Sequence, residues 1–281
     1  MEPGNTSPDH DELRELCRQA RVTMIRTVAN AGAGHLGGSL SAVEMLIVLY
    51  FGYLRIRPQE PDWEERDRFV LSKGHATPLY YTVLAMRGYF PRTWLDTFDS
   101  IDSLLQGHPD MRKTPGVDMT TGSLGQGFSA ALGMAMAGAH LEKSFRTVCM
   151  IGDGELQEGQ TWETIMYAGA RRVPRFVCIT DQNGLQLAST IDDGLPYHPV
   201  EEKWRAFGWE VLSVDGNDVV SVSEGLAAAW AHSAGPVAII SRTTKGKGVS
   251  FMEQVVKWHS ACPTPEETVR ALEELGAGAQ D

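Results

Sequence analysis

The sequence of 281 residues is 42% hydrophobic and 22% charged, a composition typical of a folded globular protein, so disorder over most of its length is excluded. Its 25 Lys and Arg against 36 Asp and Glu give a formal net charge of -11, which disfavours nucleic acids and anionic membranes as partners. The apolar runs fall short of the about 20 residues that span a bilayer, and the four cysteines form no CxxC pair, which favours reduced thiols in the cytoplasm.

The first third of the chain is predicted to be mainly helical, because apolar residues recur at nearly helical spacing from Leu13 to Val28. The expected elements, in chain order, are a helix over 12–30, a glycine-rich break over 32–38, a buried helix over 41–53, a strand over 68–71 and a helix over 78–87.

The remaining two thirds alternate between helix and strand. The expected helices cover 128–140, 155–171, 200–207 and 219–233, and the expected strands cover 147–151, 176–180, 210–214 and 236–241. Short apolar strands that alternate with helices predict an α/β fold, a parallel β-sheet with helices on both faces. We expect one domain over residues 11–275, with flexible tails at 1–10 and 276–281.

Ligands of such sheets bind at the carboxyl ends of the strands, and two of these ends carry polar residues. Asp153 lies between two glycines after one strand, and Asn183 follows the next strand thirty positions later. Carboxylate, amide and carbonyl oxygens suit Mg²⁺, which normally also binds a phosphate. Either short motif alone is typical of an ordinary turn. Their spacing, one strand-helix-strand unit, instead predicts a metal-bridged phosphate site.

This pattern resembles the thiamine diphosphate signature, and the chain from about Cys17 to His259 resembles the N-terminal, diphosphate-binding part of transketolase. Leu36 and Ser123 depart from the family pattern, in which many relatives have proline. The segments that carry the resemblance are Gly34-His35-Leu36-Gly37-Gly38-Ser39, Leu71-Ser72-Lys73-Gly74-His75, Gly107-His108-Pro109, 120–127, 152–159, Lys245-Gly246-Lys247-Gly248 and Trp258-His259.

The resemblance implies a set of site residues, which we carry over position by position. The implied ligands of Mg²⁺ are Asp153, Asn183 and the Leu185 carbonyl. The implied contacts of thiamine diphosphate are His75, Gly122, Ser123, Leu124, Gly154, Asn183, Lys245 and His259. The implied catalytic residues are three histidines of the substrate channel, His35, His108 and His259. Glu158 resembles a glutamate that couples paired active sites in the family.

The resemblance also implies a partner. In this family the pyrimidine ring and the activating glutamate belong to a second domain, for which this sequence shows no strands. We therefore expect the N-terminal subunit of a split transketolase, active in a two-plus-two heterotetramer with a pyrimidine-domain subunit. The expected reaction transfers a two-carbon ketol unit from a ketose, as sugar or sugar phosphate, to an aldehyde.

Two alternatives stay open. A split thiamine diphosphate enzyme could instead transfer an acyl unit from a decarboxylated 2-oxoacid such as pyruvate, or the chain could be a subunit that has lost its chemistry. The expected helix over 128–140 is apolar all round, which predicts burial on every side, against a partner or within its own domain.

Overall fold

The computed structural model describes residues 9–277, which build a five-stranded parallel sheet. Its strands are β1 (Arg68–Leu71), β2 (Thr147–Gly152), β3 (Phe176–Gln182), β4 (Glu210–Asp215) and β5 (Val237–Arg242). They lie in the order β1-β2-β3-β5-β4, and every neighbouring pair is parallel. The predicted α/β class and all five predicted strands are confirmed, with ends shifted by at most two residues.

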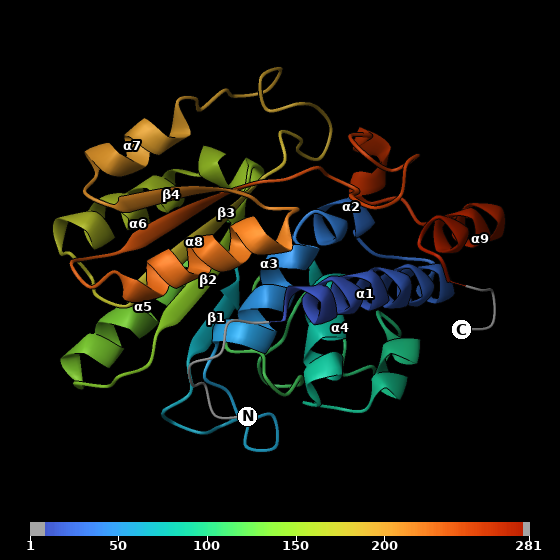
Figure 1. The fold of residues 1–281 in the computed structure, drawn as a ribbon, viewed down its shortest axis with the longest axis horizontal. Helices are drawn as coiled ribbons and strands as arrows, with labels where there is room; N and C mark the ends of the chain where they lie inside the picture. The colour runs from blue at the N-terminus through green and yellow to red at the C-terminus, as the bar shows by residue number, and fades with distance from the viewer. Residues whose placement is uncertain (1–8, 278–281) are drawn as a thin grey trace.

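Nine helices of the described chain surround this sheet (Figure 1). They are α1 (His10–Ala31), α2 (Leu36–Leu40), α3 (Val43–Val48), α4 (Thr77–Arg87), α5 (Gln126–His140), α6 (Gly159–Ala170), α7 (Val200–Ala206), α8 (Val219–Ala231) and α9 (Pro265–Glu274). A π-turn follows α3 at Leu49–Tyr53, and 3₁₀ turns lie at Arg92–Thr97, Gly154–Gln157 and Val256–His259.

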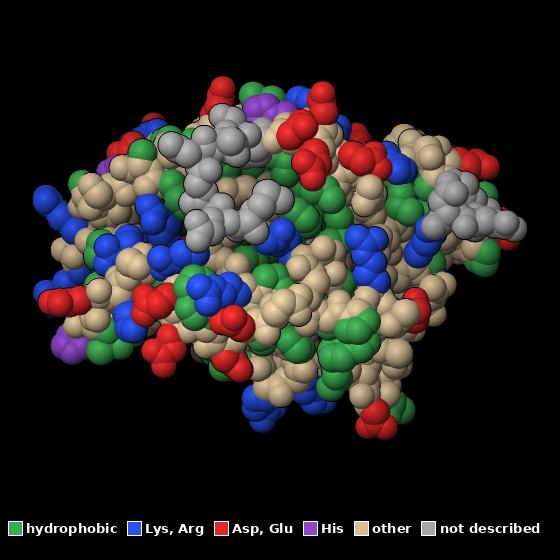
Figure 2. Space-filling model, turned by 60° about the horizontal axis from the view of Figure 1, so that its bottom comes forward, with side chains coloured by type: hydrophobic (Ala, Val, Ile, Leu, Met, Phe, Trp, Pro, Cys, Tyr) green, Lys and Arg blue, Asp and Glu red, His purple; other side chains and the backbone are tan. Residues whose placement is uncertain are grey.

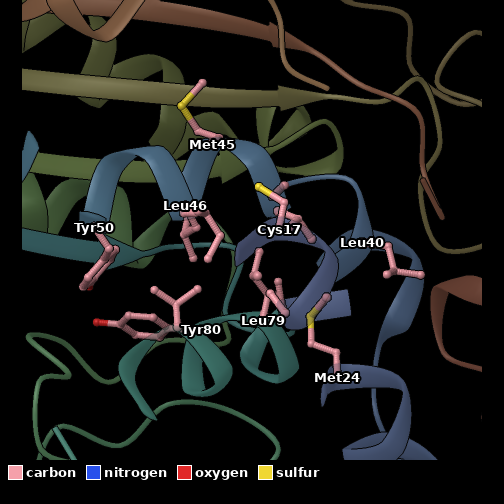
Figure 3. Packing of buried hydrophobic residues seen from close by; sticks show 14 of the residues in the cluster. Cys17, Met24, Leu40, Met45, Leu46, Tyr50, Leu79 and Tyr80 are labelled. Carbon is pink, nitrogen blue, oxygen red and sulfur yellow. The ribbon is translucent and has the colours of Figure 1, made fainter. Parts of the chain in front are cut away.

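Two hydrophobic cores lie on opposite faces of the sheet, because alternate residues of each strand point to opposite sides. One face packs against α3 and α8, with α1 and α4 beyond them, and the other packs against α5, α6 and α7. Figure 3 shows the first core, where Leu46 and Tyr50 lie opposite Leu79 and Tyr80 of α4. Because helices cover both faces of the sheet, its accessible parts are the ends of the strands.

The glycine-rich break contains a helix that the sequence did not predict. α2 begins at Leu36, inside the expected loop, and its glycines are buried. A Cβ at Gly37 would lie 2.8 Å from the Trp258 carbonyl oxygen, so glycine lets this short helix pack against the turn at Val256–His259. The expected single helix over 41–53 is instead α3 followed by the π-turn.

The chain ends also differ from expectation. α1 already begins at His10, capped by the Asp9 carboxylate, so residues 9 and 10 are not a tail. Residues 1–8 and 278–281 of the expected tails lie outside the described residues. Helix α9 was not predicted, although Thr264 and Glu267 form a capping box with Pro265 in the first turn, a recognisable start signal.

Helix α5 is not buried on all sides within this chain, so the alternative of burial in its own domain was wrong, and burial against a partner stays a prediction. One face packs against β1, β2 and α6, while Gly133, Met136 and Ala137 lie exposed on the other. Met166 and Tyr167 of α6 are exposed as well. The small residues of α5 therefore leave an apolar face uncovered within this chain.

None of the helices in residues 9–277 combines the length and the hydropathy that crossing a membrane requires. On the face shown in Figure 2, acidic and basic side chains are interspersed. Cys17, Cys149 and Cys178 are buried, and all four cysteines are free thiols.

Candidate active site

A cavity of about 510 Å³, here called the inner cavity, opens at the carboxyl ends of β2 and β3. Most of the predicted site residues line it: His35, His75, Gly122, Leu124, Asp153, Gly154, Glu158, Asn183, Leu185, Lys245 and His259. The structure adds lining residues without a predicted role, namely Gly38, Lys73, Gly152, Glu155, Gln157, Asp181, Gln186, Leu187 and Ala188. Ser123 is exposed and is not part of this wall, and His108 lines a neighbouring chamber instead.

The two expected metal ligands are direct neighbours at adjoining strand ends. Gly152 of β2 pairs with Asp181 of β3, which brings the residues after them together. The Asp153 carboxylate accepts hydrogen bonds from the backbone N–H groups of Asn183, at 2.6 Å, and Gly184, at 2.8 Å. The parallel register thus produces the proximity that the thirty-residue spacing predicted.

Asn183 is held in one orientation. Its Nδ2 donates to Asp181 Oδ2 at 3.0 Å, and its Oδ1 accepts from the Leu185 backbone N–H at 3.1 Å. A Cβ at Gly154 would meet only Gln186 Cβ, at 3.9 Å, so the protein's own packing does not require glycine there. The bare backbone of Gly154 keeps the cavity open for a ligand.

The inner cavity contains a buried carboxylate and a buried ammonium that form no direct ion pair in the described part of the chain, although the charges of Asp181 and Asp153 act on Lys245 from a longer distance. Asp153 and Lys245 are each 2% exposed, and neither forms an ion pair with another residue of 9–277. Burial raises the pKa of Asp153 to about 6, although the Tyr197 hydroxyl bonded to it acts in the opposite direction. Burial, followed by the Lys73 charge, lowers the pKa of Lys245 to about 8.

These two groups fit a metal-bound anion. A divalent cation would compensate the Asp153 carboxylate, and an anionic ligand would compensate the Lys245 ammonium. Within residues 9–277 no three His, Cys, Asp or Glu side chains come together as a metal-binding group. The expected metal ligands are instead the oxygens of a carboxylate, an amide and a backbone carbonyl, the hard donors that Mg²⁺ prefers.

A buried ion pair that sequence reasoning missed supports this wall. Lys73 Nζ donates to Asp181 Oδ2 at 2.6 Å and to the Gly38 carbonyl at 2.7 Å. Asp181 also accepts from the hydroxyls of Ser41 and Thr243, at 2.7 and 2.5 Å. Since Asp181 orients Asn183, the pair connects the end of β1 to the expected metal ligand.

Glu155 is a second buried carboxylate beneath the cavity. It accepts from the Ser72 hydroxyl and from the backbone N–H groups of Gly125, at 2.8 Å, and Gly152, at 3.3 Å. Burial raises its pKa to about 7 against these hydrogen bonds. Through Gly125 it fixes the segment 122–124, which was expected to lie against the cofactor rings.

Four histidines gather where the inner cavity meets an outer chamber. The His35 ring centroid lies 5.4 Å from that of His75, 5.6 Å from that of His259 and 6.3 Å from that of His108. His35 lines both spaces, and His108 lines the outer one only. This outer chamber has about 700 Å³ and is lined by 32–35, 106–110, Asp99, Lys113, Thr120, Thr121 and Ser260.

The inner histidines are neutral at physiological pH. Burial, then the neighbouring Lys73, holds the pKa of His75 well below its usual value. Burial, then Lys245, lowers the pKa of His259 to about 3. Lys245 Nζ lies 2.7 Å from His259 Nδ1. Since an ammonium can only donate, Nδ1 is the acceptor, and the proton of the neutral ring sits on Nε2.

The buried neutral state of His75 predicts an acid-sensitive stability. Between its lowered pKa and about 6.5, the unfolded chain binds a proton that the folded chain does not, so stability falls as pH falls. His75→Asn should remove about 1 kcal/mol of the loss between pH 7 and pH 5.5. Urea unfolding of the cofactor-free protein at both pH values measures this. His140→Asn, which alters an exposed histidine at the end of α5, is the control. Equal pH dependence of both variants would contradict the prediction.

A family model described as the thiamine diphosphate binding domain of transketolase matches residues 13–280. The 6-deoxy-6-sulfo-D-fructose transketolase subunit SqwG of Clostridium sp. is 44% identical over 266 residues, which are 94% of this chain and 96% of that protein. One of the subunits of apulose-4-phosphate transketolase from Actinobacillus succinogenes is 41% identical over 276 residues, which are 98% of this chain and 99% of that protein.

The fold also matches a solved structure. Transketolase from Leishmania mexicana has a TM-score of 0.92 to this chain at 30% identity. The alignment covers 96% of this chain and 42% of that one, so the chain spans less than half the length of that transketolase.

Proposed function

The chain belongs to the transketolase family, as its motifs predicted, and from this premise we propose that it is the diphosphate-binding subunit of a two-subunit transketolase. With a pyrimidine-domain partner, it transfers a two-carbon ketol unit from a ketose donor to an aldehyde acceptor. The two relatives named as transketolase subunits support this, because each aligns over nearly its whole length. They do not favour the acyl-transfer alternative.

The observation that carries the proposal is the pair of unmatched buried charges in the inner cavity. Asp153 needs a cation and Lys245 needs an anion, and both line the same space at the strand ends. Mg²⁺ with a diphosphate satisfies both. We assign Asp153, Asn183 and the Leu185 carbonyl to the metal, and Gly154, His75 and Lys245 to the diphosphate.

The remaining roles follow from the placement of the side chains. When bound, thiamine diphosphate supplies the electron sink that allows the bond beside a carbonyl to break and form. Gly122 and Leu124 lie along the cavity wall and support its rings. His259 presents an Nε2–H donor to a substrate oxygen, because Lys245 occupies Nδ1. His35 and His108 line the path outward and bind substrate hydroxyls.

We further propose that residues 11–275 form one diphosphate-binding domain and that the enzyme is a cytoplasmic two-plus-two heterotetramer. The four free thiols support a reducing compartment. The uncovered apolar face of α5 and α6 supports an assembly with other subunits.

The test is reconstitution with the pyrimidine-domain subunit of the same organism, in the presence of thiamine diphosphate and Mg²⁺. We expect transfer of a two-carbon unit from a ketose to an aldehyde, and no turnover when either protein is assayed without the other. Carbon dioxide release from pyruvate, without any transfer from ketoses, would overturn the proposal in favour of acyl chemistry. Product analysis with both donors distinguishes these results.

A further inference from the structure

The outer chamber carries a lysine to which the proposed chemistry assigns no role. Lys113 lines this chamber and is exposed, and it forms no ion pair with any of the residues 9–277. Because His35 belongs to both spaces, the chamber continues the inner cavity away from the cofactor site. A substrate whose carbonyl end is in the inner cavity and whose other end passes His35 enters the chamber that Lys113 lines.

The loop that presents Lys113 is held in place. The backbone N–H groups of Lys113 and Thr114 both donate to the Asp110 carbonyl, at 3.1 and 3.0 Å. The Thr114 hydroxyl, which is buried, donates to the Leu104 carbonyl at 2.6 Å. At the base of the loop the Met111 N–H donates to the Thr120 hydroxyl at 3.1 Å. The lysine thus projects from a fixed turn.

The two carboxylates of the chamber both accept hydrogen bonds within this chain, and Asp110 also has a cationic partner. Asp110 accepts from the Arg112 guanidinium at 3.2 Å and from the Arg112 N–H at 3.0 Å, which holds its pKa at about 2. Asp99 accepts from the Gly107 N–H at 2.9 Å. With Asp110 neutralised by Arg112, the ammonium of Lys113 remains available for a ligand that enters the chamber.

We propose that Lys113 binds the terminal anionic group, a phosphate or a sulfonate, of the sugar whose carbonyl end reacts in the inner cavity. The inference rests on the proposed function and names the substrate class within it. The polar groups near the histidines bind the hydroxyls of the sugar, whereas Lys113 binds its charged end. Lys113 is then a specificity-determining residue that this chain contributes by itself.

The test uses the reconstituted two-subunit enzyme and three donors that differ only at carbon 6: 6-deoxy-6-sulfofructose, fructose 6-phosphate and fructose. In Lys113→Met, kcat/KM should fall about tenfold for the anionic donors through a higher KM, and less than about twofold for fructose, because a hydrogen bond to a charged group is lost. Lys113→Arg should keep most of the preference. Lys143→Met, on a lysine paired with Glu65 after α5, should behave like the unaltered enzyme.

The outcomes distinguish a failure of the role of Lys113 from a failure of the proposed function. A loss for one anionic donor only supports the proposal and identifies which anion is bound. An equal change for all three donors, or none, overturns the role of Lys113 while the proposed function stands. If the unaltered enzyme transfers no two-carbon unit from any ketose, the proposed function itself fails.

Discussion

Asp153→Asn should reduce the affinity of the two-subunit enzyme for thiamine diphosphate and Mg²⁺ at least about 100-fold, since even residues that only support a metal ligand contribute 10–100-fold. The amide oxygen of the variant can still accept from the N–H groups of Asn183 and Gly184, and its NH₂ can donate to the Tyr197 hydroxyl. The fold should therefore persist while the charge that compensates the cation is lost. Calorimetric titration with thiamine diphosphate at fixed Mg²⁺ measures the effect.

Tyr197→Phe is the matched control, because it removes a neighbour of the same carboxylate and leaves the charge. Its cofactor affinity should fall by about tenfold, the lower end of what a residue that supports a metal ligand contributes, and so clearly less than in Asp153→Asn. Unchanged affinity in Asp153→Asn would contradict the metal assignment.

Lys73→Met should destabilise the protein by about 3–5 kcal/mol, because it leaves the buried Asp181 carboxylate without its counter-charge. Lys73 and Asp181 are each 1% exposed, so water cannot replace the lost partner. Urea unfolding monitored by tryptophan fluorescence measures the loss. Arg57→Met, which breaks an exposed ion pair with Glu60, should cost less than about 1 kcal/mol.

The pH dependence identifies the cause. Burial raises the pKa of Asp181, but the Lys73 charge and several hydrogen bonds overcome this and lower it in the intact protein. Without Lys73 the burial effect dominates, the pKa rises, and Asp181 takes up a proton in the folded state as pH falls. The deficit of Lys73→Met should therefore shrink toward acid pH. A deficit that is small, or that grows on acidification, would contradict the ion-pair argument.

The strands were predictable from sequence, because they follow from a short-range pattern of apolar residues. The proximity of Asp153 and Asn183 was predictable as well, because it follows from the parallel register of β2 and β3. Helix α2 was not, because its glycines are helical only where the turn at Val256–His259 packs against them, a contact across more than two hundred positions. Helix α9 was predictable, because its capping box marks the start of the helix in the sequence.

The supporting polar groups of the site were harder to find. Lys73 lies in a matching motif and Asp181 directly after a predicted strand, but nothing in one sequence shows that their side chains pair 108 positions apart. Tyr197 lies in an irregular stretch with no periodicity, so its hydrogen bond to Asp153 depends on tertiary structure alone. Ser123 belongs to a matching motif, yet it is exposed, and its neighbours Gly122 and Leu124 form the cavity wall instead.

The polar groups around the inner cavity follow four neighbouring strands: Lys73 comes after β1, Asp153 after β2, Asn183 after β3 and Lys245 after β5. No pair of these strands alone assembles the cavity. Ligand binding is therefore thermodynamically linked to unfolding of the whole sheet and not to the opening of one loop. Amide hydrogen exchange at central strand positions, far from any ligand contact, should slow together once the cofactor is bound.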